Sequence, residues 1–165
     1  MLGLFKKKPK EIKRDDNLYT PASGIVKNIS ASSDAMFSDK MMGDGIVIFP
    51  TSGELSSPVT GEVVMIAETK HAIALRTASN VEVLIHIGVD TVNLKGAPFD
   101  LKIKVGDILE HGDILGTMDI DQIKAAELSP EILVALTNYD DKVSQLILTE
   151  GSYDRKSQVG KIVIK

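Results

Sequence analysis

Three histidines occur in this chain, and two of them, His71 and His86, lie at the ends of neighbouring apolar runs. Residues 81–87 alternate in character, which predicts a strand whose successive side chains point to opposite faces. The odd-numbered positions of this run are all Val or Ile, and we expect them to face the core. His86 therefore lies on the other face, and Gly88 just beyond it leaves room for a ligand or a partner to approach.

The two histidines come together if the runs form a hairpin around the polar loop 77–80. The register expected across this loop pairs Arg76 with Val81. In that register, His71 lies directly opposite His86. Opposed residues in an antiparallel pair share a face, with Cβ atoms about 4.5–5.5 Å apart. A slip of one residue would move the two rings to opposite faces, so the predicted histidine pair depends on this register.

Two opposed imidazoles on an open face have three interpretations. They form an inert surface pair, a metal site, since His is the commonest metal ligand, or a phosphoryl acceptor with a helper. In the third case a neutral ring nitrogen attacks phosphorus and the second imidazole donates a hydrogen bond to the phosphate, because phosphoryl transfer depends mainly on positioning and charge stabilisation. The Thr69 hydroxyl, two residues before His71, is available to orient a ring. The residues alone leave the metal and phosphoryl interpretations open.

The elements that position this pair are predicted to be mainly short strands. Val- and Ile-rich runs are separated by clusters of Gly, Asp, Asn, Ser and Pro, which is typical of β-structure. The predicted strands cover residues 24–29, 45–49, 62–67, 72–76, 81–87 and 161–165. One helix is predicted after Asp119, which caps it together with Gln122, and Pro130 ends it. A further helical turn is predicted within residues 35–42.

The chain contains an internal repeat. Residues 21–26, which begin with Pro-Ala-Ser-Gly, recur as residues 58–63, which begin with Pro-Val-Thr-Gly. The motif Gly-Asp-Ile-Leu occurs at 106–109 and again at 112–115, and each Gly-Asp is predicted to be a turn that leads into a short strand. Two similar halves of short strands predict an all-β fold, a compact antiparallel β-sandwich with a duplicated motif and one or two short helices.

Composition limits the classes of function. Aromatic residues make up 4% of the chain against 43% for all apolar residues, so we expect an aliphatic core. The absence of Cys excludes disulfides, thiolate metal sites and Cys nucleophiles, and a net charge of −4 gives no sign of nucleic-acid binding. No apolar run approaches the length of a membrane span, and we expect a cytoplasmic location. Residues 1–19 are predicted to form a flexible basic tail with at most weak membrane contact, followed by one domain over residues 20–165.

The sequence around both histidines resembles the glucose-type enzyme IIA family of the bacterial phosphoenolpyruvate:sugar phosphotransferase system. The likeness rests on residues 68–75 and 81–96, above all on the run His-Ile-Gly-Val-Asp-Thr-Val within the second segment. It extends to residues 21–24, 37–45 and 112–113, and covers nearly all of the chain after the predicted tail. The resemblance implies an antiparallel β-sandwich with a duplicated hybrid motif, in agreement with the internal repeat.

The resemblance also implies a phosphocarrier. It implies that His86 is phosphorylated on Nε2 by the phosphohistidine carrier protein HPr, that His71 stabilises the phosphoryl group, and that Thr69 supports the pair through a hydrogen bond. The phosphoryl group then passes to the IIB domain of a sugar permease. No cofactor or metal is required, although His71 and His86 are able to bind zinc. The implied docking positions are Asp34, Phe37, Leu84, Asp90 and Val92, to which we add the apolar neighbour Met36.

Two other functions are alternatives. The spacing of His86 and Asp90 superficially matches the metal pair of lysostaphin-like zinc peptidases, whose fold is similar, but the His-x-His pair of that class is absent. A biotinyl or lipoyl carrier would be modified on Lys70. Such carriers present their lysine at a hairpin tip, whereas Lys70 is followed by His71 and an apolar strand. We therefore expect neither alternative.

Overall fold

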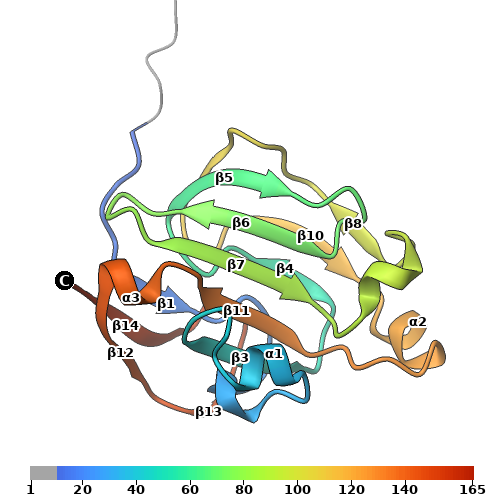
Figure 1. Cartoon of the computed structure of the whole chain (residues 1–165). Coiled ribbons are helices and arrows are strands. Elements are labelled where there is room, and N and C mark those ends of the chain that lie inside the picture. The colour runs from blue at the N-terminus through green and yellow to red at the C-terminus, as the bar shows by residue number, and fades with distance from the viewer. Residues whose placement is uncertain (1–10) are drawn as a thin grey trace, which may run out of the picture.

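A computed structural model describes residues 11–165 and shows a fold built from antiparallel strand pairs. The largest sheet has eight strands in the order β13-β2-β3-β11-β7-β6-β5-β9. Figure 1 shows β5, β6, β7, β11 and β3 side by side in this sheet. Its strands are β2 (Gly24–Asn28), β3 (Gly45–Pro50), β5 (Gly61–Ile66), β6 (Ala72–Arg76), β7 (Glu82–Ile87), β9 (Ile108–Leu109), β11 (Ile132–Leu136) and β13 (Gly151–Tyr153).

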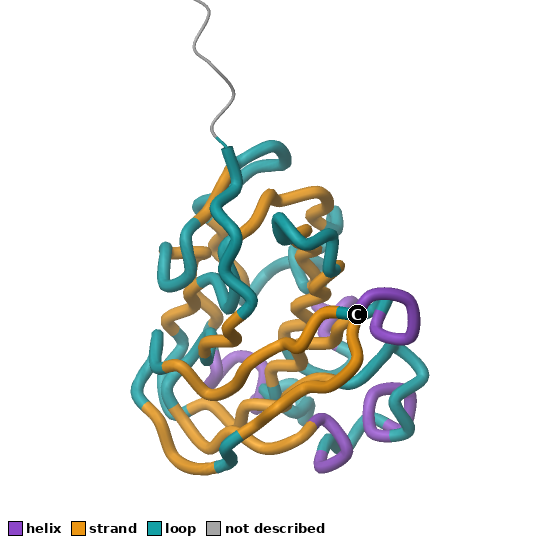
Figure 2. The backbone as a smooth tube through the Cα atoms, turned by 90° about the vertical axis from the view of Figure 1, so that its left-hand side faces the viewer, coloured by secondary structure: helices purple, strands orange, loops and turns teal. Residues whose placement is uncertain are grey.

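Two sheets of three strands complete the fold, in the orders β1-β14-β12 and β4-β10-β8. Their strands are β1 (Asn17–Tyr19), β4 (Glu54–Ser56), β8 (Phe99–Leu101), β10 (Ile114–Met118), β12 (Val143–Leu148) and β14 (Gln158–Ile164). The helical segments are α1 (Ala35–Ser38), α2 (Ile120–Ala125) and α3 (Tyr139–Lys142), with 3-10 turns η2 (Ile29–Ala31) and η3 (Thr91–Leu94). Strands and loops make up most of the backbone in Figure 2. The predicted antiparallel β-sandwich is thus confirmed.

The internal repeat corresponds to two similar hairpins, β2–β3 and β5–β6. The two copies exchange main-chain hydrogen bonds in a reciprocal manner. The amide of Tyr19 donates to the carbonyl of Pro58, and the amide of Ser56 donates to the carbonyl of Pro21, both at 2.9 Å. Donors and acceptors are each 37 positions apart in the sequence. The repeat is therefore a pseudo-twofold relation between two halves of one domain.

Side chains follow the same relation. The buried hydroxyl of Thr20 donates to the carbonyl of Ala22, and the buried hydroxyl of Ser57 donates to the carbonyl of Val59, both at 2.6 Å. A buried hydroxyl without a partner would be costly. In each copy the hydroxyl finds its acceptor two residues later in the same turn. The segments that lead into the two hairpins therefore have the same local structure.

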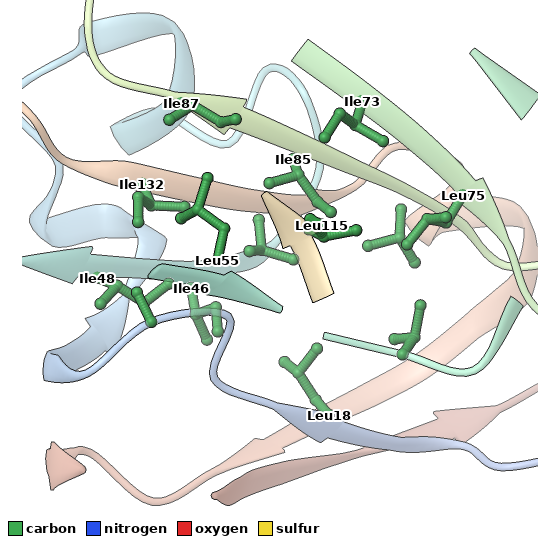
Figure 3. Close-up of a cluster of buried hydrophobic side chains, with 14 of the residues drawn as sticks. Leu18, Ile46, Ile48, Leu55, Ile73, Leu75, Ile85, Ile87, Leu115 and Ile132 are labelled. Carbon is green, nitrogen blue, oxygen red and sulfur yellow. The ribbon is translucent and has the colours of Figure 1, made fainter. Parts of the chain in front are cut away.

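The main core is aliphatic and lies between the sheets. Figure 3 shows side chains of β6, β7 and β11 pointing toward Leu55 of β4 and Leu115 of β10, with Leu18 of β1 on the far side. A smaller cluster lies on the other face of the large sheet, where Phe37 of α1 packs with Val47 of β3 and with residues of β11. Because side chains alternate along a strand, β7 contributes to both clusters.

The sequence predictions of the strands around the repeat and the histidines are confirmed. β2, β3, β5, β6 and β7 agree with the predicted strands to within one residue at each end. The helix predicted after Asp119 is α2, and the Asp119 side chain accepts a hydrogen bond from the amide of Gln122 at 3.0 Å. The turn predicted within residues 35–42 contains α1. The strand predicted over residues 161–165 is the end of β14, which begins at Gln158. The sequence did not predict β11 and α3, nor the strands β1, β4, β8, β12 and β13.

The folded domain begins earlier than the predicted boundary at residue 20. Strand β1 starts at Asn17 and pairs with β14, and the side chain of Leu18 is fully buried. Part of the predicted tail, residues 1–10, lies outside the described residues. Within residues 11–165, no helix is both long and apolar enough to cross a membrane.

Candidate functional site

His86 lies near the end of β7, on the face away from the main core, as the alternation predicted. Its neighbours Ile85 and Ile87 are buried in the main core, while the His86 ring is only partly buried. The Nδ1 atom of His86 lies 2.8 Å from the carbonyl oxygen of Gly88. A carbonyl only accepts hydrogen bonds, so Nδ1 carries the proton and, in the neutral ring, Nε2 carries the free electron pair.

The loop after β7 fixes the carbonyl that orients His86. Gly88 has φ of +80°, a conformation that L side chains rarely adopt. Its amide donates to the carbonyl of Glu131 at 2.8 Å, and the amide of Val89 donates to the carbonyl of Ser129 at 2.9 Å. The Thr91 hydroxyl donates to the carbonyl of Ile87 at 2.5 Å. The imidazole orientation therefore rests on a main-chain turn that is held from two sides.

The register between β6 and β7 differs by one residue from the prediction. Arg76 pairs with Glu82 and Ala72 pairs with His86, so His71 is not opposite His86. The hairpin loop is one residue longer than expected, because Thr77 closes it through its amide and its hydroxyl, both bonded to Val81.

The two imidazoles nevertheless meet. His71 lies one residue before β6, where strand alternation no longer dictates the direction of a side chain. The preceding Lys70 has φ of +60°, and the carbonyl of His71 accepts from the amide of Ile87 at 2.7 Å. The ring centroids of His71 and His86 are 5.1 Å apart, with an angle of 77° between the rings. The predicted pair is present. It arises because His71 lies just outside β6, and not from the strand register that was expected.

Thr69 lies in the turn between β5 and β6. Its Oγ1 atom is 2.5 Å from Nδ1 of His71, so both histidines have Nδ1 engaged. In the described part of the chain, no hydrogen bond reaches Nε2 of either ring. The site thus presents two imidazoles whose inner nitrogens are held by the protein and whose outer nitrogens are available to a ligand.

Both histidines favour the neutral form. Burial is the main cause that lowers the pKa of His86, against the opposing effects of the Gly88 carbonyl and of the carboxylates of Asp34 and Asp90. Burial, followed by repulsion from His86, lowers the pKa of His71. The unperturbed pKa of His is about 6.5, so a lowered pKa favours the neutral ring at pH 7. A neutral ring has the free electron pair that either a nucleophile or a metal ligand needs.

Helix α1 covers one side of His86. The Phe37 ring lies 5.2 Å from the His86 ring between centroids and is only 3% exposed. Phe37, one of the docking positions implied by the resemblance, therefore forms the floor of the site rather than its exposed rim. Leu84, two residues before His86 on the same face, is partly buried against the cluster that contains Phe37. The side chains of Met36 and Val92 are 50% and 45% exposed and lie at the surface.

The two predicted acidic positions begin the helical segments beside the site. Asp34 caps α1, since its side chain accepts from the amide of Met36 at 3.0 Å. Asp90 precedes η3 with φ of +60°, and its side chain makes no capping bond. Both carboxylates act electrostatically on His86. The rim of the site is therefore acidic.

Glu131 was not predicted to contribute to the site. It directly precedes β11 and is 4% exposed, and its carboxylate accepts hydrogen bonds from Ser33 and Ser129. The only sequence signal was an acidic residue at the start of the apolar run 132–136, next to serine and proline. Burial alone would raise the pKa of Glu131, but hydrogen bonds from Ser33, Ser129 and Ser32 lower it overall.

His71 and His86 are the residues that suit a metal ion best. Among residues 11–165, however, no group of three or more His, Cys, Asp or Glu side chains has the arrangement of a metal site. The third histidine, His111, stacks on Tyr19 with ring centroids 3.7 Å apart and lies 3.6 Å from Asp15. It takes no part in the pair.

Comparisons with known proteins match most of the chain. Residues 16–142 match the family described as phosphoenolpyruvate-dependent sugar phosphotransferase system, EIIA 1. The chain is 40% identical over 150 residues to the PTS system glucose-specific EIIA component of Oceanobacillus iheyensis, covering 90% of each protein. It is 40% identical over 147 residues to the PTS system glucose-specific EIICBA component of Streptococcus pneumoniae, which is 89% of this chain but only 20% of that longer protein.

A solved structure has the same fold. The glucose permease IIA from Mycoplasma capricolum superposes with a TM-score of 0.80 at 30% sequence identity, covering 87% of this chain and 93% of that one. These similarities do not support the zinc peptidase or the biotinyl and lipoyl carrier as alternatives. On the family match and the close relatives together, the chain belongs to the EIIA 1 family of the phosphoenolpyruvate-dependent sugar phosphotransferase system.

Proposed function

We propose that this chain is a cytoplasmic phosphocarrier that accepts a phosphoryl group on Nε2 of His86 from HPr and passes it to the IIB domain of a sugar permease. The observation that carries the proposal is the hydrogen bond from Nδ1 of His86 to the Gly88 carbonyl, which leaves Nε2 with the electron pair. The second imidazole, 5.1 Å away, provides the helper that such a site needs.

The transfer step follows from this geometry. The electron pair on Nε2 of His86 forms the new N–P bond while the N–P bond of the donor phosphohistidine breaks, and the donor nitrogen keeps that electron pair. The His86 ring gains positive character as the bond forms. The Gly88 carbonyl dipole, which accepts from Nδ1, stabilises this charge. The step needs no separate cofactor, because the group carried is covalently bound to the protein.

His71 stabilises the phosphoryl group in this scheme. If the Thr69 hydroxyl donates to Nδ1 of His71 across their 2.5 Å separation, the proton of the neutral ring resides on Nε2. That N–H is then the donor to a phosphoryl oxygen. Positioned donors of this kind account for much of the catalysis of phosphoryl transfer.

The surface around the histidines suits transient docking. Met36 in α1 and Val92 in η3 are exposed apolar residues on the two segments beside the site. Exposed apolar residues grouped around a site commonly mark an interaction surface. Asp34 and Asp90 attract a basic partner, which accelerates encounter more than it strengthens binding. HPr and the IIB domain would bind this surface in turn, and we propose glucose as the first sugar to test because the relatives are named glucose-specific.

The proposal is tested by incubating the chain with phosphoenolpyruvate, enzyme I and HPr and measuring its intact mass. The wild-type chain is expected to gain one phosphoryl group, and His86→Ala is expected to gain none. His111→Ala is the matched control, since His111 stacks on Tyr19 away from the pair and should leave labelling normal. Normal labelling of His86→Ala, or no labelling of the wild-type chain, would refute the proposal.

A further inference from the structure

Glu131 is a buried carboxylate at the junction of two segments that border the site. One oxygen accepts from the amide of Ser33 at 2.9 Å, and the other accepts from the hydroxyls of Ser33 and Ser129, the latter at 2.7 Å. The side chain is 4% exposed. The next five residues along β11 are all apolar and buried. Burying a charged carboxylate costs much more free energy than burying an apolar side chain. Packing alone therefore does not explain a glutamate at this position.

Through its side chain, Glu131 holds the segment that carries the floor of the site. Ser33 directly precedes Asp34, which caps α1, and the Ser32 hydroxyl accepts from the amide of Asp34 at 3.0 Å. Helix α1 in turn places the Phe37 ring against His86. Glu131 is therefore linked, through Ser33 and α1, to the aromatic ring that lies beside the His86 imidazole.

Through its main chain, the same residue holds the loop that orients His86. Its carbonyl accepts from the amide of Gly88 at 2.8 Å. The carbonyl of Gly88 then accepts from Nδ1 of His86. Glu131 thus reaches the imidazole from both sides, once through α1 and once through the loop after β7.

The influence of Glu131 on His86 is geometric rather than electrostatic. The carboxylates that act on the charge of His86 are those of Asp34 and Asp90. Three serine groups around Glu131 lower its pKa in spite of burial. The carboxylate therefore stays ionised at neutral pH, which keeps all of its oxygens as acceptors.

We propose that Glu131 is a positioning residue for phosphoryl transfer, which sets the His86 imidazole between the Gly88 carbonyl and the Phe37 ring by fastening the Ser33 turn to the start of β11. This inference rests on the proposed function, because the transfer it assists is the one proposed above. A misplacement of about 1 Å can cost 100-fold in rate, so a residue outside the contact shell of the phosphoryl group has a measurable effect.

Two single variants and their combination test the role. Glu131→Gln keeps the size of the side chain but replaces one acceptor oxygen by a donor that faces the serine hydroxyls. Ser33→Ala removes one of those hydroxyls. The control is Ser57→Ala, which removes a buried hydrogen bond to Val59 in a turn whose other partners are Gly112 and Asp113. If Glu131→Gln fails to fold, Ser33→Ala and Ser129→Ala test the same network.

We expect Glu131→Gln to lower the rate of transfer from HPr by more than any loss in its free energy of unfolding would explain, with Ser57→Ala as the reference for a purely structural change. Glu131→Gln should lower kcat by about 10- to 100-fold while KM for HPr changes less. Ser33→Ala should give a smaller loss in the same parameter, and the double variant should be no worse than Glu131→Gln alone, because the two residues act as one unit. Ser57→Ala should transfer at the wild-type rate. Additive losses, or a rate for Glu131→Gln equal to that of Ser57→Ala, would overturn the proposal.

A second measurement does not depend on phosphorylation. The ¹⁵N chemical shifts of the unphosphorylated His86 ring report which nitrogen carries the proton. The wild-type ring should show a proton on Nδ1, and Glu131→Gln should show a mixture of tautomers together with faster exchange of the Ser33 amide. An unchanged ring in Glu131→Gln rejects the positioning role. Failure of the wild-type chain to accept phosphate would instead reject the proposed function, and the ring shifts would still decide the role of Glu131.

Discussion

Replacing Gly88 by alanine separates the cost of backbone strain from the cost of crowding beside the histidine. Gly88 has φ of +80°, and a Cβ added to it would lie 2.3 Å from Cγ2 of the Thr91 side chain. Gly106 has φ of +98°, but a Cβ added there would meet no atom within 4 Å. The pair therefore shares the strain and differs in the steric contact.

The magnitudes follow from these two terms. A left-handed backbone costs an L residue about 1–2 kcal/mol, so Gly106→Ala should lower the free energy of unfolding by that amount. Crowding in a packed region adds about 1–3 kcal/mol. The total loss for Gly88→Ala should therefore be about 2–5 kcal/mol. Because Thr91 must move, its hydrogen bond to the Ile87 carbonyl and the adjacent Gly88 carbonyl should move as well.

Two assays on each variant test this reasoning. Urea unfolding gives the loss in stability, and labelling by HPr gives the effect on the Gly88 carbonyl that orients Nδ1 of His86. Gly88→Ala should lose more stability than Gly106→Ala and should accept phosphate more slowly, while Gly106→Ala should label normally. Equal losses of stability would show that the Thr91 contact costs nothing. Normal labelling of Gly88→Ala would show that the loop after β7 does not determine the orientation of the His86 imidazole.

Three further predictions concern the groups around the histidines. His71→Gln should still accept phosphate, because an amide donates a hydrogen bond to it, but should deliver it slowly to the IIB domain; delivery at the wild-type rate would make His71 dispensable. Asp90→Lys should slow acceptance from HPr and weaken its salt dependence with the fold intact, since Lys70 already occupies a similar left-handed position with φ of +60°; an unchanged rate at low salt would remove Asp90 from the docking surface. The pKa values of His71 and His86 are lower in the folded chain than in the unfolded chain. As the pH falls below about 6.5, the unfolded chain therefore binds protons before the folded chain does. The contribution of the two histidines to stability is complete above that pH and decreases as the pH falls toward the folded-state pKa values. Urea unfolding from pH 8 to pH 5 should show this decrease, and it should be smaller in the double variant His71→Gln and His86→Gln; an equal decrease in both proteins would contradict the lowered pKa values.

The sequence was sufficient where the signal was local. The alternation of residues 81–87 placed His86 on the face away from the core, because the direction of a strand side chain depends only on its position in the strand. The register was one residue off, because loop closure by Thr77 and Val81 is a matter of loop geometry that residue types alone do not specify. His71 still reaches the pair because it lies beyond the end of β6, where the penalty for a one-residue slip no longer applies.

Residues whose roles depend on distant parts of the chain were missed. Strand β11 is a continuous apolar run, buried on both faces, and gives no alternation by which to recognise it. Glu131 lies 98 positions from its partner Ser33, so no spacing in the sequence indicates the contact. Phe37 was identified as a neighbour of the site, but its burial could be known only once α1 was placed on β3 and β11.

The pseudo-twofold relation shows what distinguishes the histidine site from the rest of the fold. Asp44 precedes β3 as His71 precedes β6, and its carbonyl accepts from the amide of Leu136 at 2.8 Å, as that of His71 accepts from Ile87. In the first copy, the residue paired with the first position of the strand is Ala135, where the second copy has His86.

The two halves therefore have the same backbone arrangement but different side chains at the equivalent positions. Ala135 is buried beneath α1 in the smaller cluster, and the Asp44 carboxylate is bonded to Asn28 at 3.1 Å and lies 3.4 Å from Lys40. At the equivalent site, two neutral imidazoles leave their outer nitrogens open. The duplicated motif supplies the same strand end, whose preceding carbonyl is hydrogen-bonded in both copies, and the proposed function depends on the few side chains that differ between the copies. Placing a histidine at Ala135 would thus bury an imidazole without a helper, and we expect it to remain unphosphorylated by HPr when His86 is removed.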